Sequence, residues 1–117
     1  MHVFTHAAFA PPVDIYETET SLVVVLELAG VPRELVEVTL EGNLLTVRGE
    51  RRERCLAGKL RQFQMEIAYG HFERRIALPE NLMTAEARAV YEQGLLSIEF
   101  PKGARQDSSG RIPIEFF

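Results

Sequence analysis

Short segments in which apolar and polar residues alternate fill most of the chain between residues 13 and 101. In residues 36–40, for example, Val36, Val38 and Leu40 alternate with Glu37 and Thr39, as in a strand with one face in a core. Turn signals separate these segments about every 8 to 12 residues, and no amphipathic helix of about 10 to 15 residues interrupts them. The pattern predicts an all-β fold, an antiparallel β-sandwich, and disfavours an α/β fold.

The turn residues divide this region into individual strands. Gly42 and Gly94 mark two tight hairpins. A single helical turn is expected after Pro32, and another within the segment 80–87, which is rich in helix-forming residues. The expected strands are residues 13–20, 21–30, 35–40, 44–50, 60–70, 71–79, 87–91 and 95–100.

With 117 residues, the chain is expected to form one domain that needs no disulfide or metal to support its core. Residues 1–12 hold no sustained period and end in two prolines, so they are expected to form a short N-terminal arm. The sandwich is expected over residues 13–102. Residues 103–117 are expected to form a flexible C-terminal extension, because two glycines and two serines fill the stretch 101–110.

Composition narrows the classes of function. The net charge of −4 disfavours a nucleic-acid partner, and acidic residues and no aromatic lie among the basic residues of 48–59. No catalytic or phosphate-binding motif occurs, and the single Cys55 and three scattered histidines have no metal-ligand spacing. We therefore expect no enzyme activity, no cofactor and no metal. We also expect no membrane partner and a cytoplasmic location, since neither a signal peptide nor a long apolar span is evident.

The last residues carry the most unusual pattern, Ile112-Pro113-Ile114. In an extended chain the two isoleucines project to one side and Pro113 to the other, and the segment is suited to add to a sheet edge. The residues alone leave two possibilities open. The tail is either the last strand of its own domain, or a plug that docks weakly on a neighbouring molecule.

Several motifs, in this order and spacing, resemble the small heat-shock proteins with their α-crystallin domain. Residues 14–51 are similar to the opening half of that domain, with its E-L-x-G-V turn and its L-x-V-x-G-E-R strand. Residues 70–80 resemble its G-x-F-x-R-x-x-x-L-P-E segment. Ala89, Gly94, Leu95 and Leu96 match its A-x-x-x-n-G-v-L motif, with Gln93 in place of the usual asparagine, and Ile112-Pro113-Ile114 matches its I-x-I motif.

The resemblance implies an immunoglobulin-like β-sandwich of two antiparallel sheets. In function, it implies an ATP-independent chaperone, a holdase that binds partly unfolded client proteins. It also implies a homodimer in which a long loop, here residues 51–69, gives a strand to the partner subunit, with Phe63, Met65 and Ile67 on one face. The I-x-I motif would dock between two edge strands of another subunit, giving possible higher oligomers. The receiving residues would be Val36, Val38, Leu40 and Val90.

Other classes of function remain open on the residues alone. A co-chaperone-like sandwich that docks one defined protein partner would need neither the tail nor a swapped strand. A sandwich enzyme using Cys55 is a further alternative, as is a carbohydrate-binding module, although the chain has no tryptophan. A strictly monomeric protein in solution favours the co-chaperone-like module.

Overall fold

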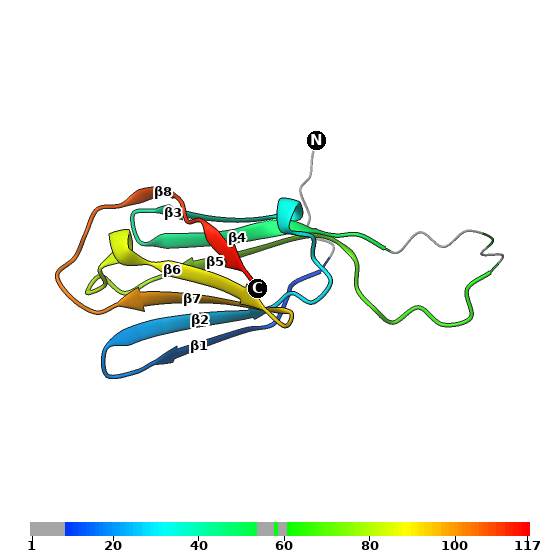
Figure 1. The fold of residues 1–117 in the computed structure, drawn as a ribbon, viewed down its shortest axis with the longest axis horizontal. Coiled ribbons are helices and arrows are strands. Elements are labelled where there is room, and N and C mark those ends of the chain that lie inside the picture. The colour runs from blue at the N-terminus through cyan, green and yellow to red at the C-terminus, as the bar shows by residue number, and fades with distance from the viewer. Residues whose placement is uncertain (1–8, 54–57, 59–60) are drawn as a thin grey trace.

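The computed structural model describes residues 9–53, 58 and 61–117, which form two packed β-sheets (Figure 1). The first sheet has the order β1-β2-β7-β6-β9 and the second the order β5-β4-β3-β8. The strands are β1 (Val13–Glu17), β2 (Ser21–Glu27), β3 (Val36–Glu41), β4 (Leu44–Arg51), β5 (Gly70–Ala77), β6 (Arg88–Glu92), β7 (Leu95–Pro101), β8 (Ser109–Arg111) and β9 (Ile114–Phe116). The predicted all-β sandwich is confirmed.

The alternation read from the sequence produces the core. In β3, Val38 and Leu40 are buried, and in β7, Leu96, Ile98 and Phe100 are buried, so the inward faces of both sheets pack on each other. The predicted helical turns are two 3-10 helices, η1 (Arg33–Leu35) and η2 (Thr84–Glu86).

The hairpin between β6 and β7 turns at Gln93 and Gly94, whose φ angles are 54° and 82°. Two successive residues with positive φ fit the twist of the flanking strands, and glycine adopts such a conformation without steric cost. A Cβ on Gly94 would also lie 3.0 Å from the Cβ of Ala29. The predicted turn is therefore present, and it places Leu96 in the core and Leu95 on the surface.

Residues 9–12 pack on the end of the sandwich, although the sequence pattern assigned them to an arm. Pro11 is fully buried, and the Phe9 ring lies 5.5 Å from that of Phe72. The Pro11 carbonyl accepts a hydrogen bond from the Arg74 guanidinium at 2.8 Å, and the Pro12 carbonyl accepts one from a β2 amide. The rest of the predicted arm, residues 1–8, lies outside the described residues.

Gly49 in β4 lets η1 lie directly against the sheet. A Cβ at this position would lie 2.0 Å from the Leu35 carbonyl oxygen and 2.8 Å from the Cζ atom of Phe72. The nearer atom belongs to the backbone, so a side-chain rotation cannot relieve the overlap. The close approach positions η1 beside the groove described below.

We therefore expect Gly49→Ala to destabilise the fold by about 3 kcal/mol, the upper range for overpacking a core. Chemical denaturation measures this free energy of unfolding. Arg48→Ala is the matched control, because the Arg48 side chain is exposed and its loss should cost less than about 1 kcal/mol. Equal stabilities of the two variants would contradict the role given to Gly49.

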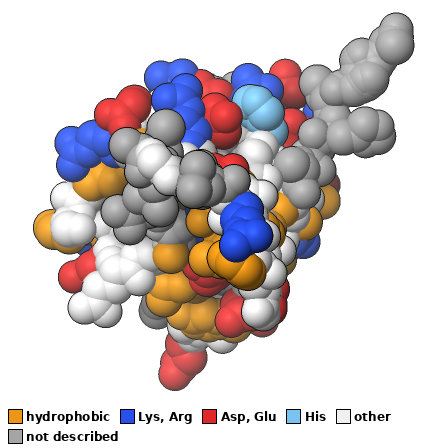
Figure 2. All heavy atoms as spheres, turned by 90° about the vertical axis from the view of Figure 1, so that its right-hand side faces the viewer, with side chains coloured by type: hydrophobic (Ala, Val, Ile, Leu, Met, Phe, Trp, Pro, Cys, Tyr) orange, Lys and Arg blue, Asp and Glu red, His pale blue; other side chains and the backbone are white. Residues whose placement is uncertain are grey.

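The segment between β4 and β5 projects away from the sandwich (Figure 1). Its described residues, 52, 53, 58 and 61–69, contain no strand. Seen from this end of the molecule, charged side chains gather toward the four-stranded sheet and hydrophobic ones toward the five-stranded sheet (Figure 2). The loop therefore extends from an end of the molecule with an amphipathic surface.

Candidate functional site: the tail groove and the projecting loop

The C-terminal tail, residues 109–117, lies along the gap between the two sheets at one edge of the sandwich (Figure 1). Strand β8 pairs with β3 in antiparallel fashion and β9 pairs with β6 in parallel fashion. The Ile112 amide donates a hydrogen bond to the Val38 carbonyl at 2.8 Å. The tail thus crosses from one sheet to the other, and we call the gap between β3 and β6 the tail groove.

The isoleucines enter this groove as their spacing predicts. Ile112 belongs to the buried core with 8% of its surface exposed, Ile114 is half-buried beside it, and Pro113 is exposed. Two hollows flank the tail, one of about 810 Å³ and one of about 210 Å³. Ile112 borders both hollows, so part of the groove beside the tail stays open.

The residues predicted to receive the tail all lie at the groove. Val38 and Leu40 of β3 are buried, Val36 of the same strand is half-buried, and each lines one of the two hollows. On the opposite side, Val90 of β6 is the register partner of Glu115, and Ala89 is the partner of Ile114. The tail that occupies the groove in this structure is that of the same chain.

Two ion pairs flank the isoleucines, one on each side of the groove. Arg111 on β8 contacts Glu37 on β3, and Glu115 on β9 accepts a hydrogen bond from Arg88 on β6 at 2.7 Å. Hydrogen bonding to Arg111, and then to Arg48, lowers the pKa of Glu37, and hydrogen bonding to Arg88 lowers the pKa of Glu115. Charge complementarity thus fixes the direction in which the tail lies.

This arrangement makes tail docking pH-dependent. A lowered pKa in the docked state stabilises docking at pH values above the ordinary carboxyl value of 4.5 and loses that effect as pH falls through the lowered pKa. We expect the hydrogen-exchange protection factor of the Ile112 amide to fall below pH 4.5. The Glu37→Gln, Glu115→Gln double variant should show weaker protection at neutral pH and a flatter pH dependence. Parallel pH profiles in both proteins would contradict the assignment.

The connector between β7 and β8 has defined contacts although its composition predicts a flexible linker. The buried Thr84 hydroxyl donates to the Gln106 carbonyl at 3.1 Å, and the Ala85 amide donates to the Gln106 side-chain oxygen at 2.8 Å. Arg105 also contacts Glu80 at 3.3 Å. Gln106 thus fastens the connector to η2 when the tail occupies its own groove.

The projecting loop carries the three apolar residues of the predicted exchange strand. Phe63 is 87% exposed, Ile67 65% and Met65 54%. None of the three belongs to the hydrophobic core of the described residues, and exposed apolar side chains that lie close together are typical of an interaction surface. At the base of the loop, Arg51 donates two hydrogen bonds to the Ala68 carbonyl, at 3.0 and 2.8 Å, which holds the two ends of the loop together.

Strand β1 has a free edge that matches this loop. It is the outermost strand of the five-stranded sheet, and only β2 pairs with it among the described residues. Ile15 is opposite Val24 in the register and therefore faces the same side, yet Val24 is fully buried and Ile15 is 49% exposed. Ile15 is thus an apolar side chain on the inward face of β1 that stays half-exposed, whereas Val13 on the same face packs against the core.

Other chemistry finds little support in the described part of the chain. Among residues 9–53, 58 and 61–117, no group of three or more His, Cys, Asp or Glu side chains is placed to hold a metal ion. Neither 3-10 helix of the described chain is long and apolar enough to cross a membrane. Arg48 and Arg52 of the basic cluster pair with Glu37 and Glu50. Cys55 lies outside the described residues.

Sequence reasoning missed several residues at the groove. Tyr91 and Arg33 each contact Phe116 beyond the second isoleucine, and the ion pairs described above involve Glu37 and Arg88. A signal for the ion pairs was present, because the tail places Arg111 before the first isoleucine and Glu115 after the second. Their partners lie on strands far away in the sequence, so only the fold identifies them.

Comparisons with known proteins agree with this architecture. The heat shock protein HSP.16.4 of Streptococcus thermophilus is 34% identical over 106 residues, which cover 87% of this chain and 72% of that protein. The small heat shock protein C2 of Rickettsia felis is 30% identical over 98 residues, but this chain covers only 64% of its length.

Solved structures give the same result. A small heat-shock protein from Xylella fastidiosa superimposes with a TM-score of 0.76 and 32% identity, covering 92% of this chain and 97% of that one. The hspA protein of Xanthomonas axonopodis superimposes with a TM-score of 0.74 and 32% identity, covering 86% of this chain and 100% of that one. The sequence model that describes the Hsp20/alpha crystallin family matches residues 14–115 of this chain. The chain therefore belongs to the Hsp20/alpha crystallin family of small heat shock proteins.

Proposed function

We propose that this protein is an ATP-independent holdase, which binds partly unfolded proteins and prevents their aggregation. The observation that carries the proposal is the seating of Ile112 and Ile114, which form an apolar cover over the groove between β3 and β6. Partly unfolded proteins expose apolar side chains and unpaired strands, and an opened groove offers both kinds of contact. Membership of the small heat shock protein family supports this reading.

The energy of the cover favours reversible docking. Burial of the two isoleucines contributes about 3 to 6 kcal/mol before costs. Ordering the backbone of about four tail residues takes back about 1 to 2 kcal/mol per residue. The gain and the cost nearly cancel, and the backbone pairing of β8 and β9 favours the docked state by a small margin. An open population therefore exists and grows when conditions weaken docking. A cover of this kind exposes apolar surface without any chemical step or nucleotide.

The same contacts can join two molecules. Every groove that accepts its own tail accepts the identical tail of another copy, which is the principle of domain swapping. The projecting loop supplies a second joint, in which Phe63, Met65 and Ile67 of one subunit cover the free β1 edge and Ile15 of its partner. We therefore propose a strand-exchanged homodimer that assembles further through its tails.

The deciding experiment combines native mass with suppression of light scattering from reduced insulin, in the absence of ATP. The holdase proposal expects a dimer or larger assembly and suppression at near-stoichiometric ratios. A monomer that leaves insulin aggregation unchanged would overturn it and favour a sandwich module with one defined partner.

A further inference from the structure

The tail carries three apolar residues on its inward side, one more than the Ile-Pro-Ile motif supplies. Ile112, Ile114 and Phe116 are buried or half-buried, whereas Pro113, Glu115 and Phe117 between and after them are exposed. Positions two apart share a face in an extended chain, so the three side chains form one continuous row. Phe116 therefore belongs to the docking surface and needs a receiving site of its own.

That site lies at the far end of the tail groove and is built from both of its sides. The Phe116 ring lies 5.5 Å from the ring of Tyr91 on β6, tilted by 50°. The guanidinium carbon of Arg33, on η1, lies 4.6 Å from the Phe116 ring centroid. An aromatic ring is thus contacted by a second ring and by a cation, two interactions that favour aromatic over aliphatic side chains.

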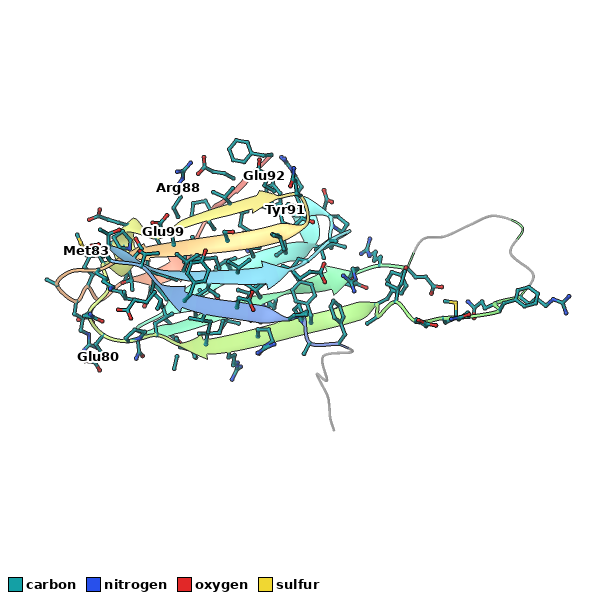
Figure 3. The ribbon with its side chains drawn as sticks, turned by 90° about the horizontal axis from the view of Figure 1, so that it is seen from below. Glu80, Met83, Arg88, Tyr91, Glu92 and Glu99 are labelled. Carbon is teal, nitrogen blue, oxygen red and sulfur yellow. The ribbon has the colours of Figure 1, made fainter. Side chains whose placement is uncertain are left out.

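Tyr91, one of the receiving residues, is held by a contact that does not involve the tail. The Tyr91 hydroxyl donates to the Leu28 carbonyl at 2.7 Å, which holds the ring in place. Arg88 and Tyr91 lie along β6 at the edge that β9 joins (Figure 3). The parallel register then sets Phe116 opposite Tyr91, while the Phe117 amide donates to the Tyr91 carbonyl at 3.0 Å.

We infer that Arg33, Arg88 and Tyr91 form a selectivity site, which admits tails with an acidic residue and then an aromatic one directly after the I-x-I motif. Arg88 selects the acidic residue through the 2.7 Å contact to Glu115, and Arg33 with Tyr91 selects the aromatic one. The partner that fits is the tail of a second copy of this chain, which supplies both residues. The inference rests on the proposed docking of tails between molecules. It adds that the groove binds the tail of this chain more tightly than tails that carry only the two isoleucines.

The test uses the full-length Ile112→Ala, Ile114→Ala protein as receptor, because its own tail competes poorly for the groove. The probes are fluorescent peptides of residues 108–117, and fluorescence anisotropy measures the dissociation constant. Phe116→Ala in the peptide should raise it about tenfold or more. Phe117→Ala is the matched control, because this ring is 73% exposed and its backbone hydrogen bond remains, so the change should stay below about threefold.

Charge reversal tests the acidic position independently. Arg88→Glu in the receptor should weaken binding of the wild-type peptide, and Glu115→Arg in the peptide should restore binding to that receptor. Different results would exclude tail docking and the selectivity site. If the wild-type peptide binds no better than one with both isoleucines replaced by alanine, docking itself is wrong. If it binds well, but the Phe116 and Phe117 variants are equal and charge reversal gives no rescue, only the selectivity site is wrong.

Discussion

Replacing both tail isoleucines, Ile112→Ala with Ile114→Ala, is expected to reduce the assembly to its dimer. Truncating the buried Ile112 and the half-buried Ile114 removes about 3 kcal/mol of apolar burial from each docked tail. That loss lowers the docking equilibrium constant by about a hundredfold, which exceeds the margin of a weak contact. Multi-angle light scattering at matched protein concentration measures the mass of each species.

Pro113→Ala is the control for this change. Pro113 lies between the two isoleucines but is exposed, so its replacement leaves the buried area unchanged. We expect the Pro113 variant to keep the wild-type mass. Circular dichroism verifies that the double variant remains folded, as expected for a change near the end of the chain. An unchanged mass in a folded double variant would show that the tail joins no subunits.

The second large effect is expected at the projecting loop. Phe63→Asp with Ile67→Asp should convert the dimer into a monomer, with the dissociation constant rising by at least about a thousandfold. Each substitution removes an apolar side chain from the proposed joint with β1 and places an unpaired carboxylate there, which is costly to bury. Sedimentation velocity over a dilution series measures the equilibrium.

The loop itself offers a matched control for this prediction. Gln62→Asp with Gln64→Asp introduces the same two charges at alternate positions, on the other face of an extended strand. That variant should remain a dimer, because those positions face solvent in the proposed pairing. Dimers of equal stability in both variants would exclude the loop as the dimer joint, while leaving the tail groove untouched.

Most of the sandwich could be predicted because its strands are short and bounded by clear turn residues. The alternation in residues 36–40 and 95–100 gave β3 and β7 nearly to the residue, and Gly94 gave the hairpin. These features are local, so a single sequence contains them. The same holds for the one-sided burial of Ile112 and Ile114, which follows from a spacing of two.

Other features depend on contacts between distant residues. The burial of Pro11 and the packing of Phe9 on Phe72 have no periodic signal, since the segment is too short to show one. Likewise, the parallel pairing of β9 with β6 follows from where the connector crosses the sandwich. Tyr91 and Phe116 became recognisable as partners only once that pairing set them opposite each other.

The loop shows a different limit. The alternation of Phe63, Met65 and Ile67 predicted a strand, but residues 61–69 form none within the chain. Alternation reports that one face is to be buried, whereas a strand also needs hydrogen-bond partners. The local pattern is the same whether those partners come from the same chain or from another one. The same ambiguity applies to the tail, whose own groove and a neighbour's are chemically identical.

Because one polypeptide carries both the groove and the tail that fits it, every subunit brings one of each to any assembly. When a tail leaves its own groove and binds in that of a neighbouring subunit, which in turn supplies its own tail, the number of occupied grooves is unchanged. Growth of the proposed assembly therefore leaves the buried apolar area at the groove unchanged. Protein concentration alone shifts subunits whose tails occupy their own grooves toward subunits linked by exchanged tails. Warming acts differently, since it empties grooves in both forms alike and thereby also breaks the proposed links between subunits. In the proposed assembly, dilution alone should therefore reduce particle size without emptying grooves, so a diluted cold sample should become smaller without exposing more apolar surface.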